Sequence, residues 1–201
     1  MRQGRPPTAG FTLIELLIVI AMVGILVGLV LPETSPALDE QLRLAAQVLK
    51  SDLAYARSLA ITNQSTYQIT FDGEENRYVL SHSGSDESLD VLPDSPFRNP
   101  GDPPEQHIVD FDELPRVGRG VRFVSAATLD LFLLPTDNIE YGPLGETTRG
   151  SYSVIWLAAG SGEETKYIWL LVYPVTGLAE EGSCSTYGPP SWIGGPTAPS
   201  V

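Results

Sequence analysis

The chain has 201 residues, of which 25 are acidic and 12 are basic, so its formal net charge at pH 7 is −13. An acidic surface repels phosphate backbones, which argues against nucleic-acid binding. Because Cys184 is the single cysteine, the chain cannot form an intramolecular disulfide, and its stability must come from packing.

The first predicted element is an apolar run at residues 11–31, in which Glu15 is the one ionisable side chain. A helix of about 20 residues spans the roughly 30 Å hydrocarbon core of a bilayer, so we expect one transmembrane helix here. Arg2 and Arg5 precede the run, whereas the first charges after it are acidic. This asymmetry predicts a cytoplasmic N-terminus, with everything after Pro32 outside the cytoplasm.

Three residues inside this run are candidates for helix association. A carboxylate costs roughly 2.5 kcal/mol or more near the bilayer centre, so Glu15 needs a partner. Gly24 and Gly28 form a small-xxx-small pair that permits close helix packing. Glycine is also frequent in transmembrane helices generally, so this pair is a weak signal.

The residues before the apolar run suggest a processing site. Ala9 and Gly10 precede the run, whereas the cleavage site of an ordinary secretory signal follows it. The string Gly-Phe-Thr-Leu-Ile-Glu at 10–15, after a short basic leader, resembles the class III signal of type IV pilins and pseudopilins. The resemblance implies a leader at 1–10, cleavage by a prepilin peptidase after Gly10, and methylation of Phe11. The alternative is a plain signal anchor.

The same resemblance assigns two further roles. It implies that Glu15 pairs with the N-terminal amine of a neighbouring subunit. It also implies that Pro32 marks the helix kink that is common in pilins.

The second predicted element is an amphipathic helix at 32–63, the outer half of a long N-terminal helix. Apolar residues recur at three- and four-residue intervals from Leu42 to Ala60, so this face must be covered by other parts of the chain. Ser35 or Asp39 could cap a restart of the helix after Pro32.

Residues 64–181 predict a β-rich extracytoplasmic domain. The expected strands are 66–71, 77–81, 108–111, 121–124, 129–134, 152–157 and 167–173. The first two should pair as a hairpin, and so should the last two. Residues 83–104 predict a proline-rich acidic loop, and 182–201 predict a loose Gly/Pro/Ser-rich tail with Trp192 and Ile193 as candidate anchors. The fold class is therefore α+β, with the helix packed on antiparallel sheet.

The sequence contains no recognisable catalytic motif, and we expect neither an enzyme nor a cofactor. The string Gly160-Ser161-Gly162 lacks the spacing of a nucleophile elbow and predicts a turn. His82 and His107 lie far apart and there is no second cysteine, so a zinc site has little support. Two acidic runs could offer oxygen ligands to calcium, but neither has the spacing of an EF-hand loop, and solvated loops are the simpler interpretation. These runs are Asp86, Glu87 and Asp90, and Asp102, Asp110, Asp112 and Glu113.

Two further strings resemble one particular branch of this family. The segments 53–61 (Leu-Ala-Tyr-Ala-Arg-Ser-Leu-Ala-Ile) and 172–178 (Val-Tyr-Pro-Val-Thr-Gly-Leu) resemble minor pseudopilin H of type II secretion systems. This resemblance implies a structural subunit of a short periplasmic pseudopilus, anchored in the inner membrane by one helix. Its implied partners are the prepilin peptidase, other major and minor pseudopilins, and the inner-membrane secretion platform.

A minor pilin of a type IV pilus, acting in adhesion or DNA uptake, would share the N-terminal features. A membrane-tethered enzyme or binding protein would need a site that the sequence does not reveal.

Overall fold

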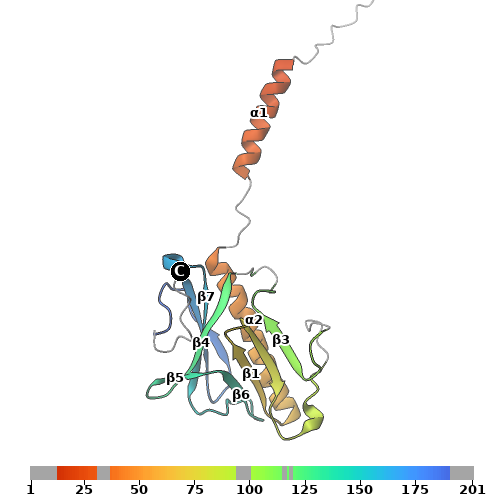
Figure 1. The fold of residues 1–201 in the computed structure, drawn as a ribbon, viewed down its shortest axis with the longest axis vertical. Coiled ribbons are helices and arrows are strands. Elements are labelled where there is room, and N and C mark those ends of the chain that lie inside the picture. Colours follow the sequence, from red (N-terminus) through yellow and green to blue (C-terminus); the bar gives the residue numbers. More distant parts are fainter. Residues whose placement is uncertain (1–12, 31–36, 94–100, 115–116, 118–119, 191–201) are drawn as a thin grey trace, which may run out of the picture. The chain divides into compact units, whose positions relative to one another are not determined.

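The computed structural model describes residues 13–30, 37–93, 101–114, 117 and 120–190, with no side-chain description for 24–30. The chain divides into two compact units, 1–35 and 36–201, which we describe separately. Figure 1 shows the elements of both units.

The first unit contains helix α1, Leu13–Val30. The side chains described in α1, from Leu13 to Val23, are all exposed. Phe11 and Leu31, the ends of the predicted transmembrane helix, lie outside the described residues. Within the described part of the chain, no helix combines the length and apolar content needed to cross a membrane.

The second unit begins with helix α2, Leu38–Asn63, which is shorter than the predicted 32–63. The N-cap Ala37 has φ −55° and ψ 144°, which lies outside the helical region, so the helix cannot include it. Asp39 therefore lies in the first turn of the helix rather than at the cap. In the first turn its negative charge interacts favourably with the helix dipole. Ser35 and Pro32 lie outside the described residues.

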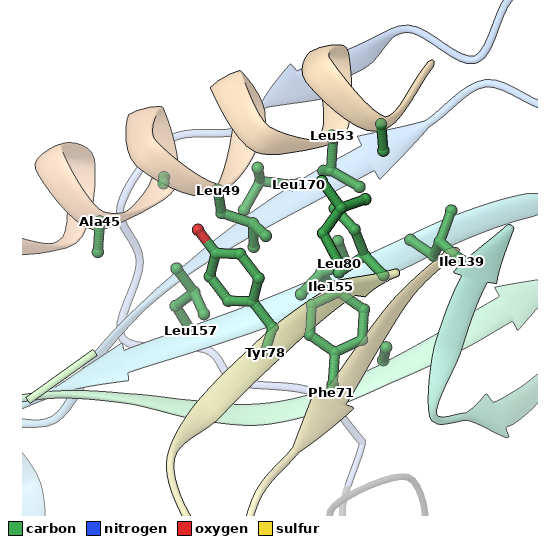
Figure 2. Close-up of a cluster of buried hydrophobic side chains, with 14 of the residues drawn as sticks. Ala45, Leu49, Leu53, Phe71, Tyr78, Leu80, Ile139, Ile155, Leu157 and Leu170 are labelled. Atoms are coloured by element: carbon green, nitrogen blue, oxygen red, sulfur yellow. The ribbon is translucent and has the colours of Figure 1, made fainter. Parts of the chain in front are cut away.

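The predicted apolar stripe of α2 is confirmed as its buried face. Side chains from this stripe point toward residues of two sheets, including Leu157, Leu170 and Tyr78 (Figure 2). The buried residues of α2 are Leu42, Ala45, Ala46, Leu49, Leu53, Ala56, Leu59 and Ala60. The main core therefore lies between α2 and the sheets, as the α+β prediction requires.

The first sheet has the strand order β3-β2-β1-β6, and all its pairs are antiparallel. Its strands are β1 (Tyr67–Asp72), β2 (Arg77–His82), β3 (Gln106–Asp110) and β6 (Asn138–Tyr141). The predicted hairpin β1–β2 is confirmed, with Tyr67 opposite His82. Strand β6 was not among the predicted strands.

The second sheet has the order β5-β4-β7-β8-β9 and is also antiparallel. Its strands are β4 (Val121–Leu129), β5 (Leu133–Thr136), β7 (Tyr152–Ala159), β8 (Lys166–Val172) and β9 (Ala179–Glu181). The predicted hairpin of β7 and β8 is confirmed. The predicted strand at 129–134 is wrong, because this apolar run is the end of β4, an exposed turn at Leu131 and Phe132, and the start of β5.

Two segments predicted to be irregular have more structure than expected. In the predicted loop 83–104, a 3₁₀ turn covers Glu87–Leu89 and Leu92 is buried. In the predicted tail 182–201, Ser185 pairs with Tyr167 of β8 through two backbone hydrogen bonds of 2.7 and 2.9 Å. Ser185 of the predicted tail is therefore bound to β8, while Trp192 and Ile193 lie outside the described residues.

Candidate functional site

The predicted processing and assembly residues lie in or before α1. Glu15 is exposed in the first turn of this helix. Gly10 and Phe11 lie outside the described residues, and Gly24 and Gly28 are described only as helical backbone. The structure therefore gives no geometry for the predicted cleavage site or for a glycine contact.

In the second unit, Arg57 joins the segments 53–61 and 172–178. Its Nε donates to the backbone oxygen of Thr176 at 2.7 Å and to that of Gly145 at 3.1 Å. Thr176 lies in the turn between β8 and β9, 119 residues after Arg57. The end of α2 is thus bound to the loops that follow β6 and β8.

Gly177 is required for this junction on steric grounds. Its φ is +64°, and a Cβ at this position would lie 2.0 Å from the backbone oxygen of Gly145. Neighbouring Tyr141 is buried, and burial raises the pKa of its phenol well above the usual value. The junction is therefore closely packed, with no room for a side chain at residue 177.

We expect Gly177→Ala to lower the free energy of unfolding by about 2–4 kcal/mol, because it adds a backbone clash to the cost of a left-handed conformation. Gly162→Ala is the matched control, since Gly162 has φ +59° and no atom within 4 Å of the added Cβ. Denaturant melts of both variants measure the difference. Equal losses for the two would mean that the junction accommodates the added methyl group.

A Ser-His-Asp cluster, which the sequence analysis missed, lies at the end of β2. The Nε2 of His82 is 2.7 Å from Ser65 Oγ, and its Nδ1 is 2.7 Å from Asp90 Oδ1. The three residues come from the turn after α2, the end of β2 and a loop, so no local motif could have identified them. These distances match those between the members of a catalytic triad.

The surroundings of this cluster do not suit catalysis. The His82 side chain is only 1% exposed. A Cβ on Gly84 would lie 2.2 Å from Ser65 Oγ, so the loop backbone packs directly on the hydroxyl and leaves no room for an acyl group. The hydrogen bonds of this cluster therefore hold the loop 83–90 against the rest of the domain.

A second polar cluster lies between α2 and the first sheet. The Tyr78 hydroxyl donates to Asp52 Oδ2 at 2.5 Å, and His107 Nε2 is 4.0 Å from Asp52 Oδ1. Burial raises the pKa of Asp52 above its ordinary 3.8, although the Tyr78 hydrogen bond and His107 act in the opposite direction. Since the folded pKa is the higher one, this group stabilises the fold most at low pH, and its contribution falls as pH rises through the raised pKa.

We therefore expect Asp52→Asn to become more stable relative to the parent as pH rises from about 3 to about 6. The amide oxygen can still accept from Tyr78 but carries no charge to bury. Urea melts at several pH values, with exposed Asp130→Asn as the control, measure this trend. A stability difference that does not change with pH would contradict it.

Several carboxylates of the predicted acidic loops accept hydrogen bonds from nearby residues. Asp86 accepts from the backbone N–H and hydroxyl of Ser88, which lowers the pKa of Asp86. Asp110 accepts from the backbone of Asp112, whose own carboxylate accepts from Asn76. In the described ranges, no group of three or more His, Cys, Asp or Glu residues is arranged to hold a metal ion.

Two other sequence candidates have structural roles. The string from Gly160 to Gly162 is the turn between β7 and β8, with φ +88° and +59° at its two glycines. Cys184 is half-buried against the main core, and its thiol donates to the backbone oxygen of Asp39 at 3.7 Å. Burial raises the pKa of this thiol, and the Asp39 carboxylate acts in the same direction.

The comparisons with known proteins concern the N-terminus and the fold. A family model described as the prokaryotic N-terminal methylation motif matches residues 5–31, which include Gly10, Phe11 and Glu15. No curated protein matches the chain in sequence.

Two solved structures similar to this chain are crystal forms of the type IV minor pilin FimU from Pseudomonas aeruginosa PAO1. In space group P21 the match has 14% identity and a TM-score of 0.43, covering 76% of this chain and 94% of FimU. In space group P65 the identity and TM-score are the same, with 75% and 98% covered.

Proposed function

We propose that this chain is a type IV pilin-like structural subunit, cleaved after Gly10 and methylated on Phe11. The proposal rests on the methylation motif at 5–31, which contains the apolar helix α1. Residues 11–31 then serve as a single membrane anchor, with the N-terminus in the cytoplasm and the domain on the other side.

The surface of α1 supports an anchoring and assembly role. Its large apolar side chains from Leu13 to Val23 are 47–82% exposed, so the helix is apolar on every side that the structure describes. A helix of this kind needs an apolar environment. Lipid supplies it before assembly, and the helices of neighbouring subunits supply it in a filament. Glu15 then pairs with a neighbour's N-terminal amine.

More specifically, we assign the chain to the minor pseudopilins of a type II secretion system. The hydrogen bond from Arg57 to Thr176 supports this assignment, because it gives the two strings that resemble pseudopilin H a shared structural role. The expected partners are the prepilin peptidase, other pseudopilins and the inner-membrane platform. The packed surroundings of His82 are consistent with a subunit rather than an enzyme.

Deletion of the gene, with complementation by the parent sequence, tests this function. We expect folded proteins that are normally secreted to accumulate in the periplasm, while surface pili recovered by shearing are unchanged. Loss of pili with normal secretion would assign the chain to a type IV pilus instead. Normal secretion together with normal pili would overturn both assignments.

A further inference from the structure

The outer face of the second sheet, which we define as the face turned away from α2, is apolar along β7 and β8. Along β7 and β8, residues such as Ile155, Leu157 and Leu170 belong to the main core, and the residues that alternate with them point to the outer face. These outer residues are Tyr152, Val154, Trp156 and Ala158 on β7, and Tyr167, Trp169 and Leu171 on β8. An antiparallel sheet with one face in water normally carries polar residues on that face.

The strand pairing places these residues side by side. Trp156 lies opposite Trp169, and Val154 lies opposite Leu171. On the other side of β7, Val154 pairs with Ala127 of β4. The apolar patch therefore covers β7 and β8 and reaches Ala127 of β4, with two tryptophans near its middle. Elsewhere on β4, Ser125 lies opposite Trp156 and Arg122 lies opposite Ala158.

Part of this patch is already buried, although its residues do not belong to the main core. Ala127 and Ala158 are 0% exposed and Val154 is 8% exposed, and the main core cluster is made of other residues. Trp169 remains 38% exposed. The outer face thus carries a second apolar cluster that is incompletely covered.

The chain after β9 runs along one edge of this face. Gly182 donates to the backbone of Trp169 at 2.8 Å, and a Cβ on Gly182 would lie 2.1 Å from the indole ring. Farther on, a Cβ on Gly188 would lie 2.7 Å from the ring of Tyr167. The backbone at 182–188 therefore packs on outward-facing rings of β8.

We infer that the segment 191–201 binds across the outer face and covers its tryptophans. This segment (Ser-Trp-Ile-Gly-Gly-Pro-Thr-Ala-Pro-Ser-Val) has no charged side chain, in a chain with 37 charged residues, counting 25 acidic and 12 basic. Proline-containing segments bind aromatic surfaces in extended form at low entropic cost. At about 3.3 Å per residue the segment is long enough to cross strands about 4.8 Å apart.

Tethering favours this occupant over a separate partner. A segment joined directly to the edge of the face has an effective local concentration on the order of millimolar, which a free protein does not reach. Trp192 and Ile193 are its largest apolar side chains and the expected anchors on the exposed part of the patch. This inference does not depend on the proposed function, since it concerns contacts within one chain.

Photo-crosslinking of the full chain in its membrane tests the inference. The photoreactive residue p-benzoylphenylalanine replaces Leu171 in one variant and Trp156 in another, with exposed Glu74 as the control position. After irradiation, gel mobility separates monomers from larger adducts, and mass spectrometry identifies the attached peptide. We expect an intramolecular adduct with 191–201 from both face positions and none from position 74.

Two substitutions in the segment sharpen the test. Trp192→Ala and Ile193→Ala together should lower the adduct yield several-fold, while Ser200→Ala should leave it unchanged. An adduct with a second copy, an adduct with another protein, or no adduct at either face position would overturn the inference. So would an intramolecular adduct whose yield does not depend on Trp192 and Ile193.

Discussion

Leu53→Asp is expected to prevent the domain 36–201 from folding. Leu53 is fully buried on α2 within the main core. Loss of a buried leucine side chain costs about 2–5 kcal/mol, and burial of an unpaired carboxylate adds several more. A domain of this size is typically stable by only about 5–15 kcal/mol, so the substitution removes most or all of its stability.

The same helix provides a matched control for this prediction. Ala54 is the next residue and is exposed, so Ala54→Asp introduces the same charge without burying it. We expect thermal melts followed by circular dichroism to show a cooperative transition for Ala54→Asp and none for Leu53→Asp. If both variants melt like the parent, the stripe on α2 does not face the core.

Glu15→Leu is expected to separate processing from assembly. The substitution keeps the apolar length of 11–31, so insertion and cleavage after Gly10 should be normal. It removes the carboxylate proposed to pair with the amine of a neighbouring Phe11. Truncating one partner of a buried charge pair costs about 2–5 kcal/mol, of which part reflects the charge left unpaired. We therefore expect crosslinking to partner subunits to fall by at least about tenfold.

Glu15→Gln distinguishes charge from hydrogen bonding in this experiment. It keeps the size and an acceptor oxygen but carries no charge. If charge pairing guides assembly, Glu15→Gln should lose most of its crosslinking while its N-terminus remains processed. Normal crosslinking and secretion in both variants would show that the carboxylate has no role in assembly.

The helix and the main hairpins could be predicted because their patterns are local. The three- and four-residue spacing from Leu42 to Ala60 matched the buried face of α2. The alternation from Tyr67 to Phe71 matched β1, and the long apolar strands β7 and β8 were unambiguous. Short strands were harder to predict from the sequence. The four residues of β6 and three residues of β9 carry too little pattern to identify.

Sites formed by tertiary contacts could not be predicted in the same way. Ser65, His82 and Asp90 meet only because β2 returns beside the end of α2. The contact between Arg57 and Thr176 joins residues 119 positions apart. The sequence could identify each string but could not show that the two meet.

Processing of the N-terminal motif can be read from the mass of the mature N-terminus. The protein should be extracted from membranes of cells with an active prepilin peptidase and analysed by mass spectrometry. We expect a chain that begins at Phe11 and carries one methyl group on its amine. A chain that retains Met1 and the leader in those cells would contradict it.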